Sequence, residues 1–215
     1  MAASHGVRII IADDHHLIAE MVKHFLEPEF EVVGIVNDGR ALVRLCDEVK
    51  PDVVVVDLAM PLLNGLDAIE QIKHATPRVK VICLTMNMDP HVVAEAFRRG
   101  ASGYLPKSAA ATEMVTALRR IVRGESYLST LITRDTMGSL LHGGDRHPQE
   151  PDITMRQREV LQLLAEGKSM KEVAYTLDLK TGTVAFHKYR IMATLGIKTN
   201  AELLQYAIKK NLIAA

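Results

Sequence analysis

The chain has little cysteine, no long uninterrupted hydrophobic run and no net charge. Its 215 residues include two cysteines, Cys46 and Cys83, too few for a disulfide scaffold and without the paired spacing of a zinc site. Charged residues interrupt every apolar run before the roughly 18 residues that cross a bilayer, and residues 1–6 lack the pattern of a signal peptide. We therefore expect a cytoplasmic protein that does not contact the membrane, with both cysteines as buried free thiols.

The neutrality is an average over segments of different sign. The 26 basic side chains cancel 26 acidic ones, which argues against a protein that is polybasic throughout. Residues 151–215 carry 10 basic and 6 acidic side chains, whereas residues 1–124 carry 14 and 16, and residues 125–150 carry 2 and 4. This offset favours an anionic partner near the C-terminus, although so small a surplus is also typical of a solvated surface.

The first part of the chain alternates short β-rich runs with segments of helical period. The predicted strands are residues 7–13, 31–37, 52–57, 80–85 and 102–105, and helical periods follow at 15–27, 66–72, 92–97 and 113–123. Continuous Val and Ile runs between amphipathic helices are typical of a parallel sheet covered on both faces. We predict a doubly wound α/β domain whose ligand lies at the C-terminal ends of the strands.

The rest of the chain has a different pattern. Residues 124–150 are predicted to be a linker, because a helix-compatible stretch at 131–141 leads into HGGDRHPQEP, which is rich in Gly and Pro. From Thr154 onward only helical periods occur, which predicts a small all-α domain of four helices. The expected domains are therefore residues 7–123 and 151–212.

Polar side chains occur where the predicted strands end. Asp13 and Asp14 follow the first strand, Asp57 the third, Thr85 ends the fourth, and Lys107 follows the fifth. Carboxylates gathered at one sheet edge repel one another unless a divalent cation neutralises them, and Mg²⁺ suits oxygen ligands. A carboxylate beside such a cation can attack phosphorus, with an ammonium and a hydroxyl group stabilising the phosphoryl oxygens.

Four ordered motifs in this part resemble the receiver domain of two-component response regulators: IADDH (11–15), VVDLAMPLLNGLDAI (55–69), LTM (84–86) and GASGYLPK (100–107). The resemblance covers about residues 7–123. It implies a five-stranded parallel sheet in the flavodoxin-like order 2-1-3-4-5 and a histidine kinase as the phosphate donor.

The resemblance also assigns roles to single residues. It implies Asp57 as the phosphoacceptor, and Mg²⁺ bound by Asp14, Asp57 and the backbone carbonyl of Ala59, with Asp13 helping directly or through water. It implies that Lys107 pairs with the phosphoryl group and that Thr85 reorients. It implies that Tyr104 is the aromatic switch, which turns inward behind Thr85.

Each residue also has a simpler interpretation when taken singly. Asp57 is then a helix cap, Lys107 a solvated loop lysine and Tyr104 a packed edge aromatic; the ordered motifs together favour the receiver. His15 and His16 suggest a transition metal, but we interpret them as surface or capping residues. The receiver departs little from its relatives, and His16 stands where they commonly have Pro. Ala59 and Asn87 flank the phosphoryl site, and these two residues leave the lifetime of the phosphorylated state open.

Residues 151–212 resemble the LuxR-type helix-turn-helix domain that follows receivers in the FixJ class of transcription regulators. Gly167 ends one helix and Ser169 caps the next, over Met170–Leu177. Residues 178–181 form the turn, and residues 182–195 form the recognition helix, which enters the major groove of double-stranded DNA. The resemblance implies a homodimer on DNA.

The recognition helix has an outward face with few cations. We expect Lys171, Lys188 and Arg190 to reach phosphates, and Thr181 or Thr183 to contact the DNA backbone. Ala185 and Tyr189 stand where relatives often carry basic residues, so base reading is expected from Ala185, Phe186 and Tyr189, through thymine methyl contacts and the tyrosine hydroxyl. Alternatively, Phe186 and Tyr189 pack against another part of the protein.

These patterns predict a phosphorylation-controlled transcription regulator rather than an enzyme. A phosphatase with an Asp nucleophile is the enzymatic alternative, but it needs a second Asp two residues later, where this chain has Ala59. A second alternative is a receiver whose helical domain binds a protein instead of DNA. Duplex binding that weakens steeply with added salt distinguishes DNA binding from this alternative.

Overall fold

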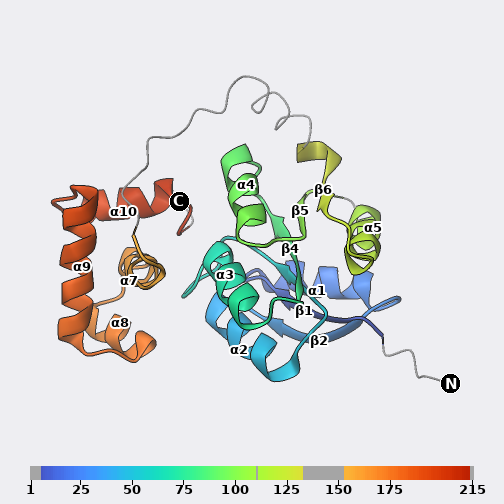
Figure 1. Ribbon diagram of the computed structural model, residues 1–215, viewed down its shortest axis with the longest axis horizontal. Coiled ribbons are helices and arrows are strands. Elements are labelled where there is room, and N and C mark those ends of the chain that lie inside the picture. The colour runs from blue at the N-terminus through green and yellow to red at the C-terminus, as the bar shows by residue number, and fades with distance from the viewer. Residues whose placement is uncertain (1–5, 110, 133–152, 214–215) are drawn as a thin grey trace. The chain divides into compact units, whose positions relative to one another are not determined.

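The computed structural model describes residues 6–109, 111–132 and 153–213. The chain divides into two compact units, one built on a β-sheet and one on helices (Figure 1). Residues 133–152 lie outside the described residues, and they include most of the predicted linker and of its helix-compatible stretch. Within the described ranges, no helix is both long enough and apolar enough to span a membrane.

The sheet of the first unit is parallel and has the strand order β2-β1-β3-β4-β5-β6. Its strands are β1 (Arg8–Ala12), β2 (Glu31–Val36), β3 (Val53–Val56), β4 (Lys80–Thr85), β5 (Gly103–Pro106) and β6 (Tyr127–Leu128). The first five confirm the predicted doubly wound sheet and its order.

The sixth strand, β6, is not predicted by the sequence. Tyr127 pairs with Gly103 of β5, and its N–H donates to the carbonyl of Ser102 over 3.0 Å. The N–H of Ser129 donates to the carbonyl of Tyr104 over 3.0 Å. Two residues are too few to show an alternating pattern. Residues 127–128 therefore belong to the sheet, within the segment predicted to be a linker.

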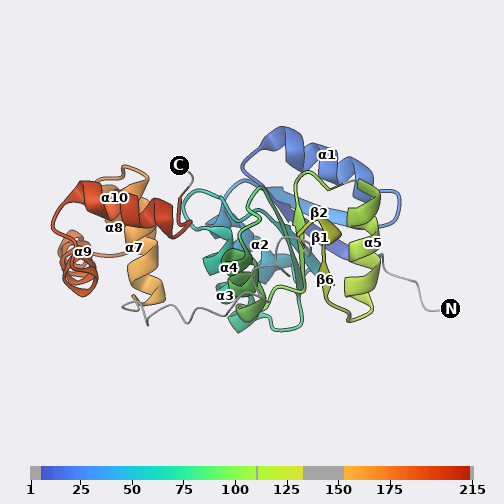
Figure 2. The ribbon, with the colours of Figure 1, turned by 90° about the horizontal axis from the view of Figure 1, so that it is seen from above.

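Helices cover both faces of this sheet. They are α1 (His16–Leu26), α2 (Gly39–Val49), α3 (Gly65–Ala75), α4 (Pro90–Arg98) and α5 (Ala111–Val122). Helices α1 and α5 lie on one face, and α2, α3 and α4 lie on the other (Figures 1 and 2). Because both faces are covered, every residue of β3 is buried, which explains its uninterrupted run of valines.

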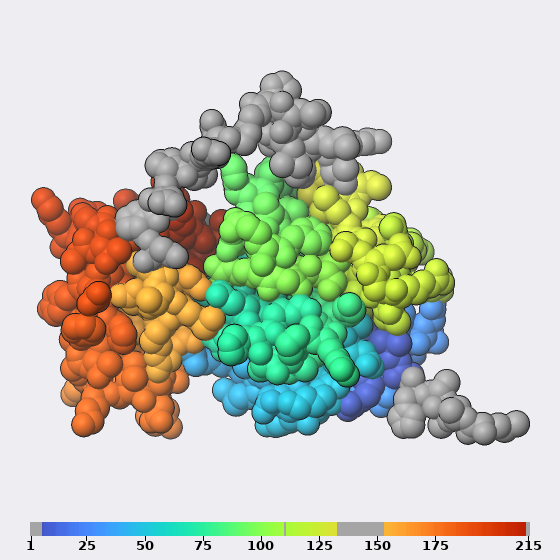
Figure 3. Space-filling view, in the orientation of Figure 1, coloured from blue at the N-terminus to red at the C-terminus, as the bar shows by residue number. Residues whose placement is uncertain are grey.

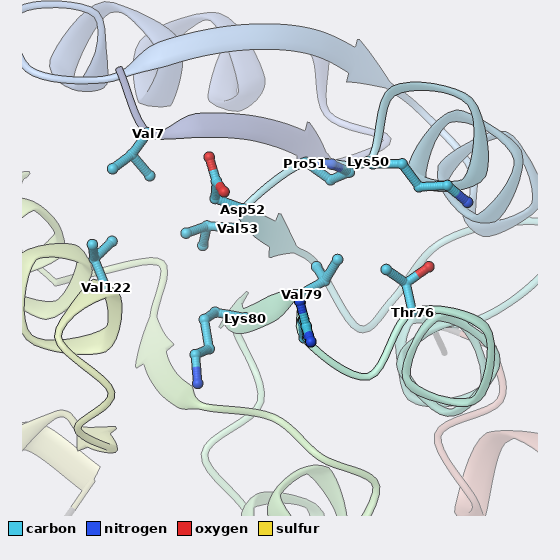
Figure 4. Close-up of a pocket in the computed structure, with 10 residues that line it drawn as sticks. Val7, Lys50, Pro51, Asp52, Val53, Thr76, Val79, Lys80 and Val122 are labelled. Atoms are coloured by element: carbon cyan, nitrogen blue, oxygen red, sulfur yellow. The ribbon is translucent and has the colours of Figure 1, made fainter. Parts of the chain in front are cut away.

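A cavity of about 600 Å³ opens at the N-terminal edge of the sheet (Figure 4). Lys50, Arg78 and Lys80 line it together with Val7 and Val53. It lies beside the starts of β1, β3 and β4, at the edge opposite the carboxylates that follow these strands. Asp52 also lines the cavity, but Asp13, Asp14 and Asp57 do not.

The second unit is helical. Its described helices are α7 (Met155–Ala165), α8 (Met170–Leu177), α9 (Thr181–Leu195) and α10 (Asn200–Lys209), which confirm the predicted all-α domain. Their shared core includes Val160, Leu163, Val173, Val184, Ile191, Leu203 and Ala207. Gly167, with a φ of +85°, ends the turn after α7 in a conformation that favours glycine.

Helix α8 begins with a capping box. The Ser169 hydroxyl accepts the N–H of Glu172 over 3.3 Å, and the Glu172 carboxylate accepts the N–H of Ser169 over 2.8 Å. We expect Ser169→Ala to lower the free energy of unfolding by about 1 kcal/mol, since it removes an acceptor for an orphan helix N–H. Urea denaturation followed by circular dichroism measures this loss. Glu172→Gln keeps an acceptor and should be close to neutral; equal losses in both variants would contradict the capping assignment.

Candidate phosphoacceptor and DNA-binding sites

The polar side chains predicted at the strand ends meet at the C-terminal edge of the sheet. Strand β1 ends at Ala12, directly before Asp13 and Asp14, and β3 ends at Val56, directly before Asp57. Asp13 and Asp57 are each 3% exposed and Thr85 is 2% exposed. The strands thus hold Asp13, Asp57 and Thr85 as a group of buried polar side chains at this edge of the sheet.

Lys107 joins two of these carboxylates. Its ammonium lies 2.7 Å from Asp57 Oδ2 and 2.8 Å from Asp13 Oδ2. Burial by itself lowers the pKa of Lys107, but the hydrogen bonds and charges of Asp13 and Asp57 outweigh it and raise the pKa above its ordinary value. The lysine therefore stays charged and offsets part of the repulsion between the carboxylates.

The backbone around Asp57 holds its side chain in place. The N–H of Asp57 donates to the carbonyl of Ala12 over 2.8 Å, which ties the end of β3 to the end of β1. The N–H groups of Leu58 and Ala59 donate to Asp57 Oδ1 over 2.7 and 3.4 Å. With Oδ1 held by backbone donors and Oδ2 by Lys107, the carboxylate has one defined orientation.

Gly65, the first residue of α3, lies against this backbone. A Cβ atom added there would overlap the carbonyl oxygen of Asp57 and lie 2.7 Å from the Cα of Leu58. These are backbone atoms that cannot rotate away. The sequence offered no reason to single out this glycine, because its neighbour in space is seven or eight positions earlier in the chain.

Gly65→Ala is expected to displace Asp57 and to slow any reaction of its carboxylate at least about tenfold, since small misplacements of reacting groups are costly. The rate of labelling by acetyl phosphate with Mg²⁺ measures the effect. Gly182→Ala is the matched control, because nothing lies within 4 Å of its added Cβ. A labelling rate in the Gly65 variant equal to that of the control would refute the expected displacement.

The acidic residues form a group suited to a cation. One ligand atom each from Asp13, Asp14, His15 and Asp57 lie within 4.8 Å of one another. Three carboxylates supply the hard oxygen ligands that Mg²⁺ prefers. The residues present therefore fit a Mg²⁺ site. Ala59, predicted to contribute its backbone carbonyl, lies beside this group, two residues after Asp57.

Thr85 and Tyr104 lie next to the carboxylates on neighbouring strands. The Thr85 carbonyl accepts the N–H of Lys107 over 2.8 Å, and its hydroxyl accepts the N–H of Asn87 over 3.3 Å. Tyr104 is fully buried, and its hydroxyl donates to the carbonyl of Asn87 over 2.8 Å. Burial, followed by the nearby Cys83 and Asp57, raises the pKa of this tyrosine. The aromatic ring is thus already turned inward, and Asn87 links it to Thr85.

In the helical unit, α9 presents an aromatic outward face. Val184 and Ile191 are fully buried, whereas Phe186 is 58% exposed and Tyr189 is 64% exposed. The buried and the exposed side chains thus lie on different faces of α9. Within the helical unit, therefore, neither aromatic ring is packed into the core.

The other predicted DNA contacts surround this face. Lys171, Thr181 and Arg190 are exposed, and Thr183, Ala185 and Lys188 are partly exposed. Thr181 and Thr183 lie in the first turn of α9, whose N-cap Lys180 makes no side-chain capping hydrogen bond. Unsatisfied N–H groups at a helix N-terminus suit contacts with phosphate.

Comparison with protein families matches both units. Residues 9–119 match the response regulator receiver domain, and residues 152–207 match the bacterial regulatory proteins of the luxR family. The transcriptional regulatory protein LiaR of Bacillus subtilis is 32% identical over 209 residues, which cover 96% of this chain and 99% of LiaR. The oxygen regulatory protein NreC of Staphylococcus haemolyticus is 34% identical over 216 residues, with coverage of 96% and 99%.

Solved structures agree with these matches. The RcsB response regulator of Salmonella typhimurium has a TM-score of 0.61 at 28% identity, covering 94% of this chain and 96% of RcsB. RcsB bound to a promoter in the presence of the phosphomimetic BeF3- has a TM-score of 0.60 at 28% identity, covering 94% and 98%. The likeness extends over the receiver and the helical unit alike.

Proposed function

Because this chain belongs to the response regulators with a LuxR-type DNA-binding domain, we propose that phosphorylation of Asp57 by a histidine kinase controls the binding of α9 to DNA. The protein is a transcription regulator rather than a typical enzyme. The observation that carries the assignment of Asp57 is its buried, oriented carboxylate, held 2.7 Å from the Lys107 ammonium at the C-terminal edge of the sheet.

In the proposed reaction, a carboxylate oxygen of Asp57 attacks the phosphorus of a phosphohistidine on the kinase. The bond from phosphorus to the imidazole nitrogen breaks as the bond from phosphorus to the Asp57 oxygen forms. Lys107 remains within reach of the new phosphoryl oxygens and offsets their charge. Asp13 retains its contact with Lys107, so the ammonium stays in place during the transfer.

Asp13, Asp14, Asp57 and the backbone carbonyl of Ala59 would hold Mg²⁺ in this site. The ion supplies positive charge that lowers the repulsion between the carboxylates and the incoming phosphate. The three carboxylates and their proximity support this role. The backbone donors of Leu58 and Ala59 then keep Asp57 oriented toward the phosphorus.

The proposed switch runs from Asp57 to the loop after β4. The Thr85 hydroxyl moves toward the phosphoryl group, which shifts Asn87, because the Asn87 N–H is bonded to that hydroxyl. Tyr104 is already buried and bonded to the Asn87 carbonyl. It therefore follows the loop rather than turning in from solvent. The change at α4 and α5 releases the helical domain or promotes dimerisation, so that two copies bind half-sites about one helical turn apart.

Base recognition is assigned to Ala185, Phe186 and Tyr189, and phosphate contacts to Lys171, Lys188, Arg190 and the hydroxyls of Thr181 and Thr183. RcsB, a relative of similar fold, has been solved bound to a promoter. The exposure of Phe186 and Tyr189 supports direct contact with base edges, where apolar groups meet thymine methyls.

Phe186→Ala is expected to weaken binding to the preferred duplex by about 1–3 kcal/mol and to relax its sequence preference. Because the side chain is exposed, the melting temperature should not change. Lys188→Ala is the contrasting variant, and it should weaken binding to all sequences alike and reduce the salt slope by about one. Fluorescence anisotropy at several salt concentrations measures both; identical behaviour of the two variants would contradict the division into base and phosphate contacts.

The alternative function is a helical domain that binds a protein. The scarcity of cations on the outward face of α9 favours it. Selection of duplexes from a random pool with the phosphorylated protein decides between the two. Enrichment of a paired motif whose binding falls steeply with salt supports DNA binding, whereas no enrichment at any salt concentration supports the alternative.

A further inference from the structure

The cavity at the N-terminal edge of the sheet has no part in the proposed phosphorylation. It is formed where the starts of β1, β3 and β4 approach the end of α5, and its volume is about 600 Å³ (Figure 4). Asp57 and Lys107 lie at the opposite edge of the sheet. Sites for small organic molecules have volumes of roughly 300–1,000 Å³. The cavity is therefore large enough for an organic ligand rather than for a single inorganic ion.

Hydrogen bonds across the strand starts hold the walls of this cavity in place. The N–H of Arg8 donates to Asp52 Oδ2 over 2.8 Å, and the N–H of Asp52 donates to the carbonyl of Arg8 over 2.9 Å. The N–H of Lys80 donates to the carbonyl of Asp52 over 2.9 Å. In the turn between α3 and β4, the N–H of Val79 donates to the carbonyl of Thr76 over 3.2 Å. The walls are therefore preorganised, which lowers the cost of ordering them around a ligand.

Two cations that line the cavity have no counter-charge. Neither the Arg78 guanidinium nor the Lys80 ammonium forms a hydrogen bond or an ion pair with any residue that the structure describes. Lys50, a third cation in the lining, pairs instead with Asp47. An anion that enters the cavity therefore meets Arg78 and Lys80 without first breaking an ion pair.

Lys73 of α3 adds to the positive charge beside the cavity. Its ammonium donates to the carbonyls of Val79 over 2.6 Å and Pro77 over 3.2 Å. Burial, followed by the charge of Lys80, lowers the pKa of Lys73. The neighbouring cations thus repel one another. A bound anion reduces this repulsion, so the charge distribution favours a negatively charged ligand.

The rest of the lining is aliphatic, with two groups suited to hydroxyls. Val53 and Val79 are buried, and Val122 of α5 is 42% exposed. The lining residues all belong to the described part of the chain, and none of them is aromatic, so the cavity offers no ring on which a nucleobase stacks. The Thr76 hydroxyl and the Asp52 carboxylate can hydrogen-bond to ligand hydroxyls. These features suit a compact aliphatic body that carries hydroxyl groups.

We propose that this cavity binds a small organic phosphate whose body carries hydroxyl groups, the class to which sugar phosphates belong. The planar guanidinium of Arg78 donates to two phosphate oxygens, and the Lys80 ammonium supplies a second positive charge. The valine side chains pack against the carbon atoms of the body. The inference goes beyond the proposed function, because it gives the receiver a small-molecule ligand at the edge opposite Asp57.

The test is calorimetric titration of the full chain with glucose 6-phosphate, for the wild type, Arg78→Ala, Lys80→Ala and Arg44→Ala. Arg44 is the matched control, because it is an exposed cation on α2 that does not line the cavity. We expect Arg78→Ala and Lys80→Ala each to weaken binding at least about tenfold, and Arg44→Ala to change it less than about twofold. Glucose and inorganic phosphate each lack one part of the ligand and should bind the wild type at least about tenfold more weakly.

Three results would overturn the inference: no saturable binding of glucose 6-phosphate to the wild type, equal affinity of the wild type and Arg78→Ala, or equal affinity for inorganic phosphate. Weaker duplex binding by Arg78→Ala, without binding of glucose 6-phosphate to the wild type, would assign these cations to DNA instead. Failure of Asp57 to be labelled, with glucose 6-phosphate binding still dependent on Arg78, would refute only the proposed phosphorylation.

Discussion

Replacing Asp57 with asparagine is expected to abolish covalent labelling of the protein by acetyl phosphate in the presence of Mg²⁺. The amide has nearly the shape of the carboxylate but is not a nucleophile toward phosphorus. Its oxygen can still accept the N–H of Leu58, and Lys107 keeps its contact with Asp13. The fold should therefore survive, and the change should be confined to the reaction.

Intact-mass spectrometry and retention of a radioactive phosphoryl group both measure this loss. Asp47→Asn is the matched control, because Asp47 is an exposed carboxylate on α2 that pairs only with Lys50 among the interactions described. The control should be labelled like the wild type. Stoichiometric labelling of the Asp57 variant would show that another residue is the acceptor.

The second large effect is expected at the junction of α3 and α4, which lie against each other in the space-filling view (Figure 3). Arg99, directly after α4, contacts Asp67 of α3 and lies 3.0 Å from Glu70 and 2.6 Å from Glu95. The Asp67 side chain is 1% exposed and that of Arg99 16% exposed. Burial by itself lowers the pKa of Arg99, but Asp67 and Glu95 outweigh it and raise that pKa.

Arg99→Ala is expected to lower the free energy of unfolding by about 3–5 kcal/mol, because it removes the guanidinium group that pairs with the buried Asp67 carboxylate. Arg98→Ala provides the comparison. Arg98 is 71% exposed and pairs with Glu95 at the surface, so its loss should cost less than about 1 kcal/mol. Urea denaturation measures both variants, and a cost for Arg99→Ala no larger than that for Arg98→Ala would contradict this account.

The sequence predicts those parts of the structure that follow from local patterns. Uninterrupted Val and Ile runs mark buried strands, so the residues that end them, Asp13, Asp57 and Thr85, are placed at one edge without further information. The capping box at Ser169 and the buried Val184 and Ile191 follow from local pattern in the same way.

What the sequence does not predict depends on contacts between distant residues or on side-chain torsion angles. The pair of Arg99 and Asp67 is separated by 32 positions, and no local pattern marks it. The clash expected at Gly65 depends on the path of the backbone after β3. His15 lies one residue from Asp14, yet only its torsion angles decide that the imidazole turns toward the carboxylates. Strand β6 is too short to have a periodic signal.

The central claim is that phosphorylation at Asp57 controls binding to DNA. The most direct test is the affinity for the selected duplex, measured by fluorescence anisotropy, with and without BeF3- and Mg²⁺, for the wild type and Asp57→Asn. We predict that the wild type binds about 5–150 times more tightly when activated, the range typical of coupling between two sites, and that Asp57→Asn does not respond. Equal affinity of the wild type with and without activation, or an equal increase in Asp57→Asn, would contradict it.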